Sequence, residues 1–213
     1  MTKLKAIVTE FLHHLPYSAT GVAAAFGIVM AWKKLAVNQQ SIDYFHITHP
    51  THIFLSAVVT TAIFWKFHRH WLQAILVGLV GTLPICTISD IFIPHLGSVL
   101  LGTPTVLHIC MIEEPYLVFP ACFAGIFLGI FLLKYVERVT EIGHLLHVLV
   151  SSLASLLYLI AFDASLWQES LFLVFLITLL AVWVPCCLSD IVFPLLFVPK
   201  NSIEQWHGPH CHH

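Results

Sequence analysis

The stretch "CTISDIFIP", Cys86 to Pro94, places a Ser-Asp pair inside an apolar run, and "CCLSDIVFP", Cys186 to Pro194, repeats it one hundred residues later. The two copies keep Cys, Ser, Asp, Ile and Pro in register. A charged side chain in the middle of a membrane segment costs about 2.5 kcal/mol or more on insertion scales. A chain that carries this cost twice in the same setting is expected to use both aspartates.

The composition indicates an integral membrane protein. Of the 213 residues, 59% are hydrophobic and only 9% are Asp, Glu, Lys or Arg, with a mean hydropathy of +0.91. Soluble domains contain about a quarter of charged residues, so the lipid bilayer is the expected surrounding. The formal net charge of −2 gives no basic surface, which excludes nucleic acid as a partner. Homo-oligomer formation is left open.

Six apolar runs are long enough to cross a bilayer, which takes about 20 residues. They are residues 16–32, 50–67, 71–89, 115–135, 144–162 and 170–197. At these lengths they predict helices, and no cleaved signal peptide is expected. Residues 96–112 are apolar but interrupted by glycine and proline, so an interfacial or re-entrant segment is expected there. Gly125 and Gly129 give the small-residue spacing that favours close helix packing.

Basic residues orient the predicted spans. With the N-terminus in the cytoplasm, seven of the nine Lys and Arg residues fall on the cytoplasmic side: Lys3, Lys5, Lys66, Arg69, Lys134, Arg138 and Lys200. Lys33 and Lys34 fall outside. This bias predicts a multi-pass protein with both termini cytoplasmic, in the cell (inner) membrane.

Further matches between the two halves indicate an internal duplication. "HPTHIFLS" at 49–56 aligns with "HLLHVLVS" at 144–151, and "HHLPY" at 13–17 aligns with "IEEPY" at 112–116. The matches occur in the same order in both halves. We therefore predict an all-α integral membrane protein, one membrane domain with six transmembrane helices as two three-helix inverted repeats (3+3): residues 1–100, and residues 101–213 with a cytoplasmic His/Cys tail at 200–213. Inverted repeats are typical of transporters.

The repeated motifs predict two sets of metal ligands near opposite membrane faces. The outer set is His49, His52, Cys86 and Asp90 with Glu113 or Glu114. The inner set is His144, His147, Cys186 and Asp190 with His14. Residues three or four apart share a helix face, which supports convergence within each set. Proline four residues after each aspartate is expected to break the helix and free the aspartate's carbonyl oxygen.

The ligand types favour a first-row divalent cation. Imidazole, carboxylate and an optional thiolate suit zinc first, and also iron, manganese, cobalt or nickel. The leading hypothesis is a transporter or permease for this cation, and the alternative is a membrane metalloenzyme, a zinc or di-iron hydrolase or oxidase. A haem held by His52 and His147 ranks low, because the two are expected at opposite faces.

Purely structural roles remain open for each candidate. The aspartates can cap helix ends, the histidines can bond backbone or lipid at the interface, and Glu113 and Glu114 can complement a helix dipole. His46 extends the spacing of His49 and His52 but has no counterpart in the second half. The six cysteines do not form a disulfide pattern, and Cys110 and Cys122 are interpreted as small buried hydrophobic residues. The tail "HGPHCHH" is either a metal-collecting segment or incidental.

Overall fold

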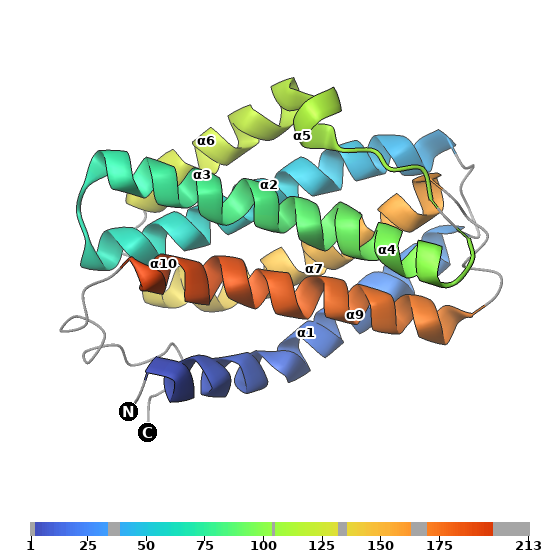
Figure 1. Ribbon diagram of the computed structural model, residues 1–213, viewed down its shortest axis with the longest axis horizontal. Helices are drawn as coiled ribbons and strands as arrows, with labels where there is room; N and C mark the ends of the chain where they lie inside the picture. Colours follow the sequence, from blue (N-terminus) through green and yellow to red (C-terminus); the bar gives the residue numbers. More distant parts are fainter. Residues whose placement is uncertain (1–2, 34–38, 104, 132–135, 163–169, 198–213) are drawn as a thin grey trace.

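The computed structural model describes residues 3–33, 39–103, 105–131, 136–162 and 170–197 (Figure 1). Within these ranges the chain is helical and has no strand, which confirms the predicted all-α class. The predicted His/Cys tail lies outside the described residues.

The long helices run back and forth along one axis, and successive ones point in opposite directions (Figure 1). In chain order, the elements are α1 Lys3–Lys33, α2 Gln39–Phe67, α3 Trp71–Thr87, the π-helical turn η1 Ile88–Phe92, α4 Ile93–Leu100, α5 Cys110–Glu113, α6 Pro115–Phe131, α7 Val136–Phe162, α9 Leu171–Cys187, the π-helical turn η3 Leu188–Val192 and α10 Phe193–Leu196. The start of α1 and the end of α10 lie at the same end of the bundle.

Among the described residues, five helical stretches are long and apolar enough to span a membrane: Leu15–Trp32, Gln40–Phe67, Trp71–Leu100, Leu145–Phe162 and Leu171–Asp190. The remaining predicted span corresponds to a shorter apolar helix, Pro115–Phe131. Large apolar side chains such as Leu72, Leu76 and Val80 are exposed along α3. A row of this kind is what a lipid-facing helix presents.

The third predicted span does not end at Ser89. The helix continues through η1 and α4 to Leu100, 30 residues in all, and Asp90 lies inside it. The expected break at Pro94 is also wrong, because one turn widens instead: the Ile93 N–H donates to the Ile88 carbonyl, five residues back. Widening accommodates a proline that lacks an N–H and would crowd a regular turn.

The second copy of the motif makes the same turn. In η3 the Phe193 N–H donates to the Leu188 carbonyl, again five residues back. The duplicated sequence therefore gives a duplicated local structure, centred on each Ser-Asp pair. Of residues 96–112, the first part belongs to α4, and the described residues of 103–109 are non-helical.

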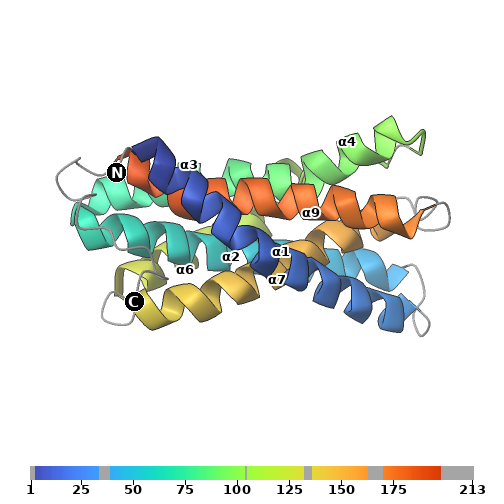
Figure 2. The same cartoon turned by 90° about the horizontal axis from the view of Figure 1, so that it is seen from below.

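The central helix is α2, which packs against α6, α7 and α3. The α6 glycines permit this contact, because a Cβ on Gly125 would lie 2.4 Å from the Phe54 carbonyl oxygen and one on Gly129 would lie 2.6 Å from that of Val58. The predicted close packing at these glycines is confirmed. On another side of the bundle, α1 packs against α7 and α9 (Figure 2).

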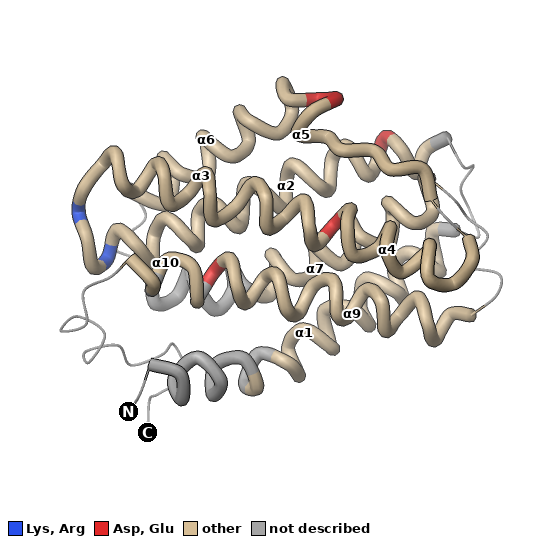
Figure 3. The backbone as a smooth tube through the Cα atoms, in the orientation of Figure 1, with Lys and Arg blue, Asp and Glu red and all other residues tan. Residues whose placement is uncertain are grey.

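Charge is unevenly distributed along the bundle. The Lys and Arg side chains that the structure describes, Lys66 and Arg69, are exposed at one end, whereas acidic residues also occur within the bundle (Figure 3). Asp90 and Asp190 are 0% and 1% exposed. These buried carboxylates locate the polar interior of an otherwise apolar protein.

Candidate metal centre

The histidines of α2 converge on Asp90 in η1. The Nδ1 atoms of His49 and His52 lie 2.8 and 2.7 Å from the same carboxylate oxygen, Oδ2. All three side chains are fully buried. Their three-residue spacing puts both imidazoles on one face of α2, as predicted.

The hydrogen bonds to Asp90 fix the tautomer of both imidazoles. An ionised carboxylate only accepts hydrogen bonds, so each Nδ1 carries the proton and donates it. In the neutral ring, Nε2 then keeps its lone pair. A carboxylate on one ring nitrogen and a metal on the other is the usual arrangement of metal-binding histidines. Asp90 therefore orients His49 and His52 as ligands through Nε2.

His52 Nε2 points at the second half of the chain. It lies 3.0 Å from Nε2 of His147 in α7, with ring centroids 4.5 Å apart. The other ring nitrogen of His147 lies 3.3 Å from Asp190 Oδ2. The four side chains form a buried row in which two imidazoles meet at the centre and a carboxylate stands behind each.

Two thiols lie beside the meeting imidazoles. The sulfur of Cys86 is 3.7 Å from His52 Nε2, and that of Cys186 is 3.9 Å from it. In a tetrahedral zinc site, Zn–N and Zn–S bonds of about 2.05 and 2.3 Å place two nitrogens about 3.3 Å apart and a sulfur about 3.6 Å from a nitrogen. The distances from His52 Nε2 are close to these values, and the ligand atoms of His52, His147 and Cys186 all lie within 4.8 Å of one another, so these three side chains could hold one ion, with Cys86 beside His52.

The distances favour Asp90 as an orienting group over a direct ligand. His49, His52 and Asp90 also bring three ligand atoms within 4.8 Å of one another. However, an oxygen and a nitrogen on one tetrahedral ion stand about 3.3 Å apart, whereas Asp90 Oδ2 is 2.7 Å from His52 Nδ1. That separation is typical of a hydrogen bond. The Cys186 thiol, which the prediction leaves optional, is better placed to bind.

A layer of hydroxyl groups joins the two halves. Ser151 on α7 donates to Asp90 Oδ1 over 3.0 Å, and Ser56 on α2 donates to Asp190 Oδ1 over 3.1 Å. Each serine also pairs with the serine of the opposite motif, at 3.1 Å for Ser89 and 2.9 Å for Ser189. Each of these serine contacts in one half therefore has an equivalent in the other.

Hydroxyl groups from the opposite half also bond the free backbone carbonyls at the widened turns. In η1 the Ile93 N–H bonds to Ile88, and the next residue is Pro94, so the Ser89 carbonyl has no helical donor. Ser155 donates to it over 3.3 Å. Thr60 does the same for the Ser189 carbonyl, over 3.2 Å. The prediction expected the aspartate carbonyl to lose its helical donor. In the structure it is the serine carbonyl of each motif that accepts a bond from a hydroxyl group instead.

The prediction of two stations near opposite faces is wrong in this geometry. His52 was assigned to the outer set and His147 to the inner set, yet their ring nitrogens are in contact. The reason is that the helix carrying Asp90 continues to Leu100, whereas the prediction ended it at Ser89, so the first motif lies deeper in the bundle than expected. The two sets meet at one point. The expected separation of His52 and His147 is therefore no longer an argument against a haem bound by both.

Seven predicted site residues belong to this cluster: His49, His52, Cys86, Asp90, His147, Cys186 and Asp190. Glu113 and Glu114 do not, because they lie at α5 and pair with His108 and His46. The Ile109 N–H bonded to Glu113 holds the pKa of that carboxyl below its ordinary value. The side chains of His14 and His144 lie outside the described residues.

The sequence analysis missed the hydroxyl layer and the partners of the two glutamates. Ser56 and Ser151 end the aligned "HPTHIFLS" and "HLLHVLVS" segments, so their repetition was the available signal. His108 carries no such signal.

No known protein family, curated protein or solved structure matches the chain.

Proposed function

We propose that the chain is an integral membrane protein that carries a divalent transition-metal cation, zinc first among them, across the bilayer. The cation binds at the central site, defined as His52, His147, Cys86 and Cys186 with Asp90 and Asp190 behind them. One observation carries the proposal: an imidazole from each half meets the other at a single buried point.

The charge of the central site supports a cation as substrate. Two buried carboxylates face one another across the imidazoles, and the described Lys and Arg side chains are exposed at one end of the bundle. Buried charge is stable only when it is compensated. A divalent cation would offset this negative charge, and nitrogen and sulfur ligands favour zinc-like ions over calcium or magnesium.

The distribution of ligands supports a carrier. In inverted-repeat transporters, the substrate binds at the interface between repeats, and rocking of one repeat against the other opens the site to each side in turn. Here each half supplies one imidazole, one thiol and one carboxylate. Tilting one half would separate His52 from His147 and release the ion. The six-span arrangement with two inverted repeats, and cytoplasmic termini, are part of this proposal.

The burial of the central site disfavours the enzyme alternative. Catalytic zinc sites keep one position open for water or substrate, whereas the side chains of His52, His147 and Cys186 are at most 2% exposed. A haem between His52 and His147 is also disfavoured, because nitrogens 3.0 Å apart leave no space for a porphyrin.

Transport is tested by zinc uptake into liposomes that contain the purified protein and a trapped zinc-sensitive dye. Wild-type protein is expected to raise uptake above that of empty liposomes, and His52→Gln with His147→Gln is expected to abolish the increase. His70→Gln, on an exposed histidine before α3, is the matched control and should transport normally.

Metal analysis of the same samples distinguishes a protein that transports zinc from one that only holds it. Tightly bound zinc without uptake would identify a permanently bound structural ion and overturn the proposal. Normal uptake by the double histidine variant would do the same.

A further inference from the structure

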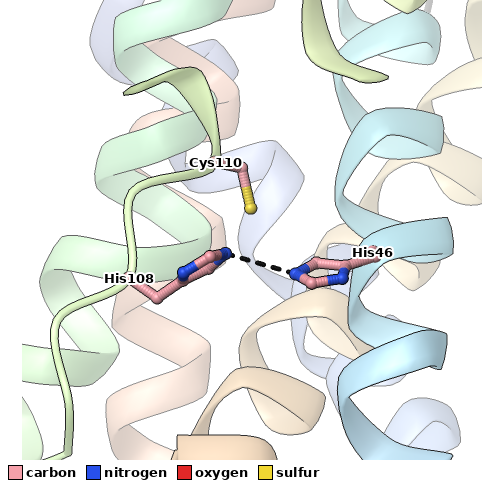
Figure 4. A group of neighbouring side chains, drawn as sticks. All are labelled: His46, His108 and Cys110. Atoms are coloured by element: carbon pink, nitrogen blue, oxygen red, sulfur yellow. Dashed lines mark hydrogen bonds between the residues drawn. The ribbon is translucent and has the colours of Figure 1, made fainter. Parts of the chain in front are cut away.

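A second cluster of metal-ligand side chains lies at α5, away from the central site. Nε2 of His46 and Nε2 of His108 are 3.2 Å apart, with ring centroids separated by 5.2 Å. The ligand atoms of His46, His108 and Cys110 all lie within 4.8 Å of one another. Figure 4 shows the two rings pointing at each other and the Cys110 sulfur directed toward the gap between them.

Carboxylates stand behind both imidazoles here as well. His108 Nδ1 lies 2.8 Å from Glu113 Oε2, and His46 Nδ1 lies 3.5 Å from Glu114 Oε2. The Nδ1 atom of His108 therefore donates to a carboxylate, and its Nε2 faces the other ring. This is the arrangement of the central site, built from different residues.

The fold holds the two histidines in this position. His46 lies on α2, and His108 lies on the non-helical segment before α5. Tyr158 donates to the Val106 carbonyl over 3.0 Å and ties that segment to α7. The ring of Phe162 stacks on His108 with centroids 5.0 Å apart. The cluster is thus a fixed contact between α2, α5 and α7.

Access distinguishes this cluster from the central site. The side chains of His46 and His108 are 20% and 13% exposed, and Glu113 is 50% exposed. Three protein ligands would leave a fourth position open, as in zinc sites that exchange a ligand.

His49 links the two clusters along α2. His46, His49 and His52 recur every three residues, so each step advances about 4.5 Å along the helix axis. His49 Nε2 is buried and has no hydrogen-bond partner among the described residues. An unsatisfied buried polar atom costs about 1–3 kcal/mol. A cation passing from His46 to His52 would meet this free lone pair midway.

We propose that His46, His108 and Cys110, with Glu114 beside them, form a second divalent-metal site, which captures the cation from solution and delivers it through His49 to the central site. The capture site stands on its own geometry. Its role in delivery rests on the proposed transport function.

The site is tested by counting zinc ions bound to purified protein in detergent, by calorimetry and metal analysis. Wild-type protein is expected to bind two ions per chain. The double variant His46→Gln with His108→Gln should bind only the central ion. The double variant His52→Gln with His147→Gln should bind only the ion at the capture site. His95→Gln, whose ring bonds Thr105 outside both clusters, should still bind two.

A single ion in wild type, or two ions in the His46/His108 variant, would overturn the capture site. Retention of the central ion shows that this variant is folded. A Cys110→Ser variant provides an independent test and should weaken only the ion that the His46/His108 variant loses.

Delivery is tested in the liposome assay. The His46/His108 variant is expected to need about tenfold more zinc for half-maximal uptake, with the maximal rate nearly unchanged. An unchanged half-maximal concentration would overturn delivery while leaving the second site intact. Two bound ions with no uptake in wild type would overturn transport and leave both sites standing.

Discussion

The central and capture sites use the same local chemistry in two different surroundings. Each brings two Nε2 atoms together, at 3.0 and 3.2 Å, with carboxylates on the Nδ1 side and cysteine close by. The central histidines His52 and His147 are fully buried, whereas His46 and His108 of the capture site are partly exposed. The same set of groups is thus suited to holding an ion in one place and exchanging it in the other.

The two sites also differ in origin. The central site takes equivalent residues from both halves of the chain, with Ser56 and Ser151 making equivalent bonds to Asp190 and Asp90. The capture site joins α2 to the segment before α5, and His46 has no aligned histidine in the second half. The central site, which is symmetric, is thus the one that would alternate between two states. The capture site, which is not symmetric, is the one that would face one side of the membrane.

The largest difference between the sites should come from sulfur. Cys86→Ser with Cys186→Ser is expected to weaken central binding by at least about a thousandfold, because the sulfur ligand of the His52, His147 and Cys186 group and the neighbouring Cys86 thiol are both lost from a site type worth about 10–16 kcal/mol. Cobalt substitution checks this, since the thiolate charge-transfer absorption should fall to the Cys110 contribution alone. Unchanged absorption would show that the central thiols do not bind metal.

Removal of an orienting carboxylate should have the next largest effect. Asp90→Asn is expected to weaken central binding by about 10–100-fold, since it frees the imidazoles without removing a ligand. Asp190→Asn is expected to have an effect in the same range, because Asp190 stands behind His147 as Asp90 stands behind His52. Zinc titration in the His46/His108 variant measures both. A complete loss of the ion on Asp90→Asn alone would instead make Asp90 a direct ligand.

The hydroxyl layer sharpens the comparison between halves. Ser151→Ala and Ser56→Ala each remove one hydrogen bond to a buried carboxylate, so each should weaken central zinc affinity by about 2–10-fold. The two effects should be similar, because the contacts are equivalent. Markedly unequal effects, measured in the same titration, would show that the halves are not functionally equivalent.

Glu113→Gln should have the smallest effect. The Glu113 side chain is half exposed, so its pairing with His108 is screened by water. We expect less than about a threefold loss of affinity at the capture site and no change at the central site. A large loss would mean that Glu113 binds the ion directly.

Much of the local structure is readable from the sequence. The apolar runs predict helices, and the duplicated Ser-Asp motif predicts that Asp90 and Asp190 share one kind of environment, which the two equivalent π-helical turns bear out. The turns themselves were not predicted, because a proline four residues after an aspartate is compatible with a break, a kink or a widened turn. The choice depends on Ser155 and Thr60, which satisfy the freed carbonyls from other helices.

The sequence by itself determined the residue types: two acidic motifs in an apolar chain, each with cysteine four residues before the aspartate and histidines elsewhere in its half. Only the tertiary structure decided that His52 meets His147 and that His108 meets His46. Helical periodicity fixes which face a side chain occupies, but the depth at which faces from distant segments meet depends on how the helices pack. Contacts such as Ser56 with Ser189 and Ser151 with Ser89 hold α2 and α7 against the two motifs at that depth, and the spacing within one chain does not specify it.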